Sequence, residues 1–154
     1  MAKRHASLVP LSHAHHRALV LAHRLQRGLA GSTDPDWPAE PTDQVRYVAA
    51  FQREHLEPHF RAEEEAVFPA LTSHSREAEG LVEALREEHR HLREAVAHLQ
   101  VTAIEALPRA LAALGVLLEG HVRREERDLF PRVQQHVPEE ALAHMGEAIR
   151  RIVG

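Results

Sequence analysis

The stretch HFRAEEEAVFPAL at residues 59–71 has a second copy, HVRREERDLFPRV, at residues 121–133. Six of the thirteen aligned positions are identical: one His, one Arg, two Glu, one Phe and one Pro. Each copy places a glutamate four residues after its histidine, as His59–Glu63 and His121–Glu125. Because positions four apart share one face of a helix, about 5–6 Å apart at Cβ, each copy sets an imidazole beside a carboxylate. Two such pairs facing each other would offer two nitrogens and two carboxylates to a shared metal site.

A single His-x-x-x-Glu pair in a charged helix is usually explained by a solvated surface. The second copy changes this interpretation, because a surface has no reason to repeat Phe-Pro at the same distance from the same His and Glu. The proline also restricts the helix around the residue before it. The repeat therefore favours a shared, inward-facing site.

Length and composition limit the classes of protein that fit. The chain has 154 residues, which predicts a single domain over residues 1–154 that is long enough to bury a core. Its net charge of −4 gives no electrostatic argument for binding nucleic acid or an anionic membrane. Because it has no cysteine, disulfides and thiolate metal sites are excluded, and any metal must be held by nitrogen and oxygen. Fourteen histidines are an enrichment that needs an explanation.

The N-terminus, MAKRHASLVPLSHAHH, has a basic start but no long apolar run after it, so it is not typical of a secretory signal. No stretch approaches the roughly 20 apolar residues of a membrane span. We therefore expect a soluble, cytoplasmic protein that binds neither nucleic acid nor membrane. The sequence does not indicate the oligomeric state.

Four long amphipathic segments without strand alternation predict an all-α, up-down-up-down four-helix bundle. The bundle is expected over about residues 11–136, with a short C-terminal fifth helix over about residues 138–153. The four helices are expected from about Ser12 to Leu29, Thr42 to Phe68, Arg76 to Thr102, and from Thr102 onward.

Several single residues are expected to shape these helices. Ser12 and Ser75 are suitable N-caps, and Gly31 is suitable for the end of the first helix. Pro58 lies inside the second helix, where a proline removes a backbone hydrogen bond, so we expect a kink there. Trp37, in the proline-rich linker 31–41, is expected to pack across the end of the bundle.

Six ionisable side chains are predicted to point into the bundle: His15, His59, Glu63, His89, His121 and Glu125. A lone histidine on an apolar face is usually a core residue with a satisfied hydrogen bond. Four of them on four helices, two with a carboxylate one turn later, indicate a metal site, because burying such groups is costly unless they are paired or bind metal. His13, His16 and His91 lie off the apolar stripes and are expected to stay out of the site.

The order His…His-x-x-x-Glu…His…His-x-x-x-Glu, with Glu-Glu and Phe-Pro in both paired motifs, resembles the hemerythrin-like (HHE cation-binding) domain family. The resemblance covers about residues 11–133. It implies a non-haem di-iron centre in a four-helix bundle, in which the two carboxylates bridge the two iron ions. Carried over by position, the implied ligands are His15, His59, Glu63, His89, His121 and Glu125.

The chain departs from the oxygen-carrying members of that family at two positions. They have a fifth histidine one turn after the third-helix ligand, where this chain has Arg93. They have an aspartate five residues after the fourth-helix histidine, where this chain has Glu126, while Glu125 stands at four. Each metal would keep two histidines and the shared carboxylates, with positions open for water, O2 or peroxide. His55 is the best candidate for an additional ligand or a supporting group and His91 is a weaker one, but both are expected to be ordinary polar residues.

Nitrogen and oxygen ligands with open positions suit two iron ions, with manganese as a less obvious substitute; zinc fits poorly with a bridged pair. Ligand histidines usually donate their other ring nitrogen to an acceptor. The candidates for such support are Gln52, Glu64, Glu65 and Glu126, and the glutamates otherwise face solvent.

Two classes of function follow for such a site, and the sequence leaves open whether the protein is an enzyme. It would either carry out redox chemistry with peroxide, O2 or Fe(II), like a catalase or a ferroxidase, or reversibly bind O2 or NO and sense oxygen or iron. The missing fifth histidine favours redox chemistry, since an extra open coordination position on the metal favours its irreversible oxidation. A metal-free bundle that binds a partner is a third class.

Overall fold

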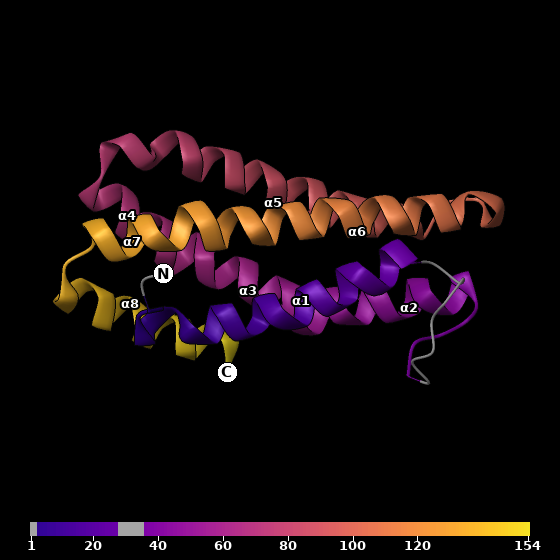
Figure 1. Cartoon of the computed structure of the whole chain (residues 1–154), viewed down its shortest axis with the longest axis horizontal. Helices are drawn as coiled ribbons and strands as arrows, with labels where there is room; N and C mark the ends of the chain where they lie inside the picture. Colours follow the sequence, from indigo (N-terminus) through magenta and orange to yellow (C-terminus); the bar gives the residue numbers. More distant parts are fainter. Residues whose placement is uncertain (1–2, 28–35) are drawn as a thin grey trace.

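The computed structural model of the chain describes residues 3–27 and 36–154. Its α-helices are α1 (Val9–Arg27), α2 (Pro41–Phe51), α3 (Glu57–Ala62), α4 (Phe68–His74), α5 (Glu79–Leu99), α6 (Leu107–Arg124), α7 (Phe130–His136) and α8 (Glu139–Val153). Short 3-10 turns precede α1, α5 and α6, and the described residues contain no strand. Figure 1 shows α1, α2–α4, α5 and α6–α7 as four long helical rods running alternately in opposite directions, with α8 folded back along one end. The predicted all-α bundle with a fifth helix is confirmed.

Two of the four rods contain π-helical turns, and each turn precedes a proline. The turns are Gln52–Leu56, Glu63–Val67 and Glu125–Leu129. In each one, the residue before the proline donates its N–H to the carbonyl five residues earlier, as Phe68 does to Glu63 and Phe130 to Glu125. A proline clashes with the carbonyl four residues before it, and a single π turn is the usual way to insert such an irregularity into an α-helix. The irregularity expected at Pro58 takes this form.

The helix ends follow the predictions only in part. α1 begins at Val9, after a 3-10 turn capped by the side chain of His5, so the prediction that Ser12 caps the helix was wrong. The Ser12 hydroxyl instead donates to Glu126 at 2.8 Å. Ser75 has the extended backbone of an N-cap residue, but its side chain makes no capping hydrogen bond within the described part of the chain. The predicted helix end at Leu29 and Gly31 lies outside the described residues.

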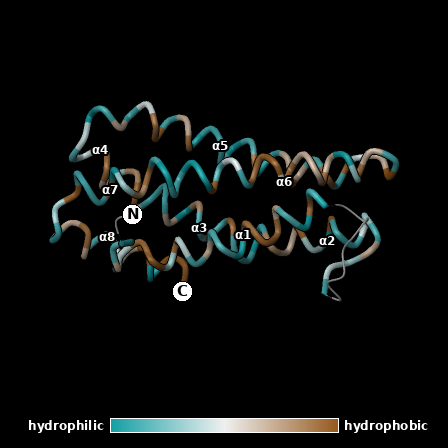
Figure 2. The backbone as a smooth tube through the Cα atoms, viewed as in Figure 1, coloured by the Kyte–Doolittle hydropathy of each residue, from teal (hydrophilic) through white to brown (hydrophobic). Residues whose placement is uncertain are grey.

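Two hydrophobic cores lie on either side of a polar layer in the bundle. Along α1, Leu11 belongs to one core and Ala18 to the other, with His15 between them. Along α5, Leu85 and Leu92 flank His89 in the same way. Figure 2 shows hydrophobic and hydrophilic residues alternating along the helices, as expected when each helix buries one face. The site therefore interrupts the core at one level across all four rods.

Trp37 is buried in the core farther from α8, where its ring meets the edge of Tyr47 at a centroid distance of 5.2 Å. It packs at the end of the bundle, as predicted. At the same end α1 and α6 approach closely, and Gly115 permits this. A Cβ on Gly115 would lie 2.7 Å from the carbonyl oxygen of Ala22, which is too short for any side chain.

Candidate metal centre

The six predicted ligand side chains lie together in the polar layer. His15 comes from α1, His59 from α3, His89 from α5 and His121 from α6. The two glutamates, Glu63 and Glu125, are the first residues of the π-helical turns that follow α3 and α6. None of the six is more than 3 % exposed. All four rods of the bundle thus contribute to one buried cluster.

The cluster divides into two groups of four that can each hold a metal ion. One group is His15, His59, Glu63 and Glu125, and the other is Glu63, His89, His121 and Glu125. Within each group the candidate ligand atoms lie within 4.8 Å of one another. Both glutamates belong to both groups, so the geometry offers two adjacent positions with two shared carboxylates.

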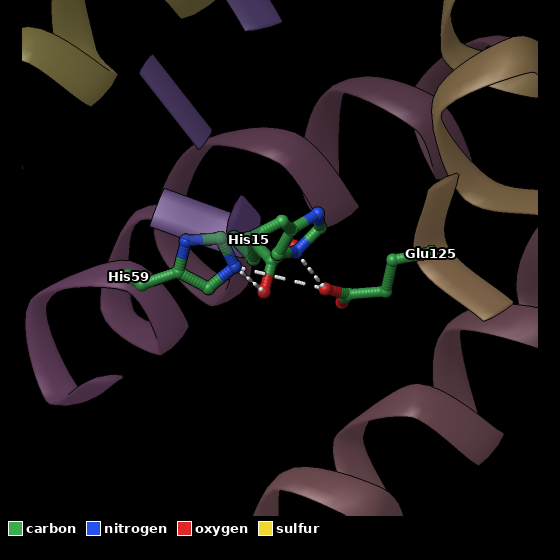
Figure 3. Close-up of side chains that lie close together, drawn as sticks. His15, His59 and Glu125 are labelled. Carbon is green, nitrogen blue, oxygen red and sulfur yellow. Dashed lines mark hydrogen bonds and ion pairs between the residues drawn. The ribbon is translucent and has the colours of Figure 1, made fainter. Parts of the chain in front are cut away.

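The Nε2 atoms of all four histidines face these carboxylates. Oε1 of Glu125 lies 2.9 Å from His15 and 3.4 Å from His121. Oε1 of Glu63 lies 3.2 Å from both His59 and His89. Figure 3 shows His15 and His59 converging on the carboxylate of Glu125. The separations suit nitrogen and oxygen atoms that surround a cation, because most are longer than a normal charge-assisted hydrogen bond.

Several of these atoms fit a metal because they form no hydrogen bond within the described residues and face one another only at ion-pair distances. Both side-chain oxygens of Glu63, Oε2 of Glu125, and Nε2 of His59, His89 and His121 are buried, and they lack a hydrogen-bond partner within the described residues. Leaving such a group unpaired costs about 1–3 kcal/mol. A cation between the histidines and the carboxylates would satisfy all of them, so the residues present fit a metal site.

Three of the four histidines donate Nδ1–H to a glutamate outside the cluster. His15 pairs with Glu126 at 2.6 Å, His89 with Glu64 at 2.7 Å and His121 with Glu88 at 2.8 Å. Such pairs fix the ring orientation and leave Nε2 free to bind metal. Glu64 and Glu126 follow directly after Glu63 and Glu125, which explains why both motifs carry two adjacent glutamates.

The phenylalanine of each Phe-Pro pair covers one histidine. Phe130 stacks on His15 with centroids 5.2 Å apart and an interplanar angle of 11°. Phe68 stacks on His89 at 5.6 Å and 23°. The aromatic rings close the cluster on the side of the core that α8 covers. This contact accounts for the repetition of phenylalanine at a fixed distance from the paired residues.

In the metal-free protein, carboxylates inside and around the cluster offset the charge of its histidines. Burial lowers the pKa of the histidines, but the surrounding carboxylates outweigh this effect and raise the pKa of His59 and His121 to about 9 and that of His89 to about 11. Burial raises the pKa of Glu125, yet His121 and its neighbours hold that pKa well below its usual range. Without metal, imidazolium and carboxylate pair with each other. A metal ion must therefore displace protons from the histidines when it binds.

The family model described as the hemerythrin HHE cation binding domain matches residues 8–145. The chain belongs to this hemerythrin family. No curated protein and no solved structure matches the chain. Membership and the buried His and Glu groups agree on a metal-binding helical domain.

Arg93, which stands where oxygen-carrying hemerythrins have a fifth histidine, does not enter the cluster. Its guanidinium donates to Glu57 at 2.9 Å and to Glu64 at 2.9 Å. Because Glu64 accepts from His89, Arg93 holds the acceptor of a candidate ligand in place. Gln52 donates to Glu57 at 3.0 Å, so it belongs to this network and does not contact a ligand histidine.

The remaining candidate residues of this hemerythrin domain lie at the surface. His55 is exposed, packs against the ring of Phe51 and belongs to neither group of four. His91 is exposed and lies 3.5 Å from Glu87. Glu65 is exposed and pairs with Arg61 at 2.9 Å. His13 and His16 are exposed as well, in agreement with their position off the apolar stripe.

Sequence reasoning missed Glu88, the acceptor for His121. The signal for it was available, because Glu88 directly precedes the candidate ligand His89 in a helix whose phase was predicted. It also missed Arg4, which donates to Glu126 at 3.0 Å from the segment before α1. No helical periodicity points to a residue outside the bundle.

A small apolar cavity adjoins the cluster. Its volume is about 10 Å³, and His15, His59 and His121 line it together with Ala18, Leu56 and Leu118. A space of this size holds about one water molecule. The hemerythrin cluster thus has room beside it for a molecule of only a few atoms.

No helix in the described part of the chain is both long and apolar enough to cross a membrane.

Proposed function

We propose that this hemerythrin domain holds two iron ions, bridged by Glu63 and Glu125, and reacts with or binds O2, peroxide or NO. The observation that carries the proposal is that both glutamates belong to both four-residue groups. One ion would be held by His15 and His59, the other by His89 and His121. All six residues are buried, so the site is shielded from bulk solvent.

The donor set supports iron over the alternatives. Imidazole suits iron, zinc, copper and nickel, whereas carboxylate suits harder ions such as manganese. A pair of ions that share two carboxylates and keep open positions differs from the closed tetrahedral site that structural zinc prefers. Manganese is the less favoured substitute. The hemerythrin family match supports a cation-binding domain without selecting the element.

We propose small molecules as the reactants because the space beside the cluster is small and the few protein ligands leave coordination positions open. Each ion would have two histidines and two shared carboxylates, and Arg93 is engaged with Glu57 and Glu64 where a fifth histidine would bind. The adjoining cavity of about 10 Å³ has room for about one water molecule, which favours a reactant of only a few atoms.

When bound, the iron pair would take electrons from peroxide or Fe(II) and pass them to peroxide or O2. The chain supplies the surroundings: the outer glutamates fix the histidine rings, and Phe68 and Phe130 exclude water from one side. We favour a catalase-like or ferroxidase-like reaction, because open coordination positions on the metal favour catalytic turnover over reversible carriage of O2. The alternative is reversible binding of O2 or NO, or sensing of oxygen or iron, which the small apolar cavity also supports.

Elemental analysis of freshly purified protein tests the metal. We expect close to two irons per chain, with the ultraviolet absorption of an oxo-bridged ferric pair. One zinc per chain and no iron would contradict the proposal. Two assays then separate the classes, one with hydrogen peroxide and one with excess Fe(II) and O2. Many turnovers of oxygen release or of Fe(II) oxidation support the enzyme, and a single stoichiometric spectral change without turnover in either assay supports the binding or sensing module.

A further inference from the structure

The two halves of the site correspond residue by residue, except at one position. His15 corresponds to His89, and the His59 motif corresponds to the His121 motif. The bond from His15 to Glu126 matches the bond from His89 to Glu64. The bond from His121 to Glu88 should likewise be matched by a bond from His59 to residue 14, because residue 14 precedes His15 as Glu88 precedes His89. Residue 14 is alanine.

Among the described residues, His59 is consequently the one histidine of the cluster without an outer acceptor. Its Nδ1 is buried and has no hydrogen-bond partner there, and the side chain is only 3 % exposed. Figure 3 shows one ring nitrogen of His59 facing the carboxylates and the other pointing away from them. If Nε2 binds metal, Nδ1 carries the proton and must donate it. This step rests on the proposed function.

A cavity of about 250 Å³ lies beside this histidine. Ala14, His59 and Val153 are among its lining residues, and its polar lining comes from His13, Arg17, Glu54 and His55. Within the described part of the chain, the guanidinium of Arg17 forms no hydrogen bond or ion pair, and it is exposed at the cavity. The cavity is thus lined by the imidazole whose Nδ1 lacks a partner, by a guanidinium and by apolar surface.

We propose that this cavity binds a small aliphatic carboxylate, of the size of acetate, that takes the position of the missing glutamate. One carboxylate oxygen accepts from His59 Nδ1, as Glu88 accepts from His121, and the other faces Arg17. The alkyl part lies against Ala14 and Val153. Glu54 disfavours anions of higher charge, such as phosphate, because it is a like charge on the same wall. The bound carboxylate orients His59 and so adjusts the metal site from outside.

Calorimetric titration of the iron-loaded protein with sodium acetate tests this proposal, with sodium chloride at equal ionic strength as the reference. We expect saturable binding of one acetate per chain and none of chloride. Arg17→Gln should weaken acetate binding about tenfold, as expected for the loss of one charge-assisted hydrogen bond. Arg27→Gln is the matched control, since it removes the same charge from the same helix away from the cavity, and it should bind acetate as wild type does.

Ala14→Glu supplies the missing carboxylate covalently. This variant should keep its iron and lose acetate binding. The proposal is overturned if wild type shows no saturable binding, if chloride binds equally well, which would mean an adventitious ion only, or if Arg17→Gln and Ala14→Glu both bind acetate unchanged. Iron is measured in the same samples. Absence of iron would overturn the proposed function, whereas full iron without acetate binding would overturn this inference alone.

Discussion

Glu126 lies 2.6 Å from Nδ1 of His15, although 111 positions separate the two residues. Glu64 stands in the same relation to His89, at 2.7 Å. Each paired motif therefore supports the single histidine of the other half of the chain through its second glutamate and its phenylalanine. The cluster is complete only when all four rods have docked, which ties formation of the site to formation of the bundle.

Loss of an outer glutamate should weaken metal binding without removing a ligand. We expect Glu126→Ala or Glu64→Ala to lower metal affinity by about 10–100-fold, because the histidine rings lose their orientation. Competition with a chelator measures this. Glu65→Ala is the control, since Glu65 pairs with Arg61 at the surface. Equal affinity in Glu64→Ala and Glu65→Ala would show that the outer bonds do not matter.

Neighbouring histidines should differ sharply in their effect on metal content. His15→Ala should reduce metal occupancy, whereas His13→Ala should leave it near the wild-type value, because His15 is 3 % exposed and His13 is at the surface. The same contrast is expected between His89→Ala and His91→Ala. Metal analysis of the four purified variants decides it, and the reverse order at either pair would place the site elsewhere.

Removal of the metal should destabilise the protein. A ligand that binds only the folded state stabilises it by about 2.7 kcal/mol at a free concentration of 100 times Kd. Chelation under reducing conditions should therefore lower Tm, measured by circular dichroism. The double variant Glu63→Ala, Glu125→Ala removes both proposed bridges. If it still binds two irons and melts where the loaded wild type does, the glutamates do not bridge.

The metal-free protein should be most stable in mildly acidic solution. The folded-state pKa is raised from 6.5 to about 9 for His59 and His121, and to about 11 for His89. The contribution of these histidines to the free energy of unfolding is therefore complete below pH 6.5 and is lost as the pH rises through 9 and beyond. The pKa of Glu64 is lowered from 4.5 to about 2, so its contribution is complete above pH 4.5 and is lost as the pH falls toward 2. Urea unfolding of chelated protein should show a maximum between these limits.

Metal affinity should increase as the pH rises through the pKa values of the ligand histidines, because these histidines must lose their protons to bind metal. Proton release on metal addition, measured in a weakly buffered solution, checks this. Uptake of metal without release of protons would mean that the histidines do not become ligands.

Two glycines on α6 should respond in opposite ways to alanine. Gly115→Ala should destabilise the protein by about 1–3 kcal/mol, because its Cβ would meet the backbone of Ala22 and push α1 from α6. A methyl group on Gly120 would meet no atom of the described residues within 4 Å, so Gly120→Ala should be neutral or stabilise by up to about 1 kcal/mol. Urea unfolding of both variants gives the comparison.

The sequence was sufficient for the bundle and for the set of inward-facing candidate ligands, because leucine spacing sets the helical phase and the repeat identifies the paired residues. Ser12 was misassigned because a serine suits both a helix cap and a long-range bond, and only the folded chain brings Glu126 to it. The networks around Arg93 and Glu88 depend on how neighbouring helices are rotated, which periodicity within one helix does not report.

The π-helical turns also have a consequence for placing such sequences on a helical wheel. In a uniform α-helix, five residues advance by roughly 100° each, so Glu63 and Phe68 would stand about 140° apart around the axis. The hydrogen bond from Phe68 back to Glu63 closes the turn at five residues and brings both toward the same side. Glu125 and Phe130 are related in the same way. A change in pitch, placed after each paired motif, lets one rod present a carboxylate to the cluster and an aromatic ring to its edge.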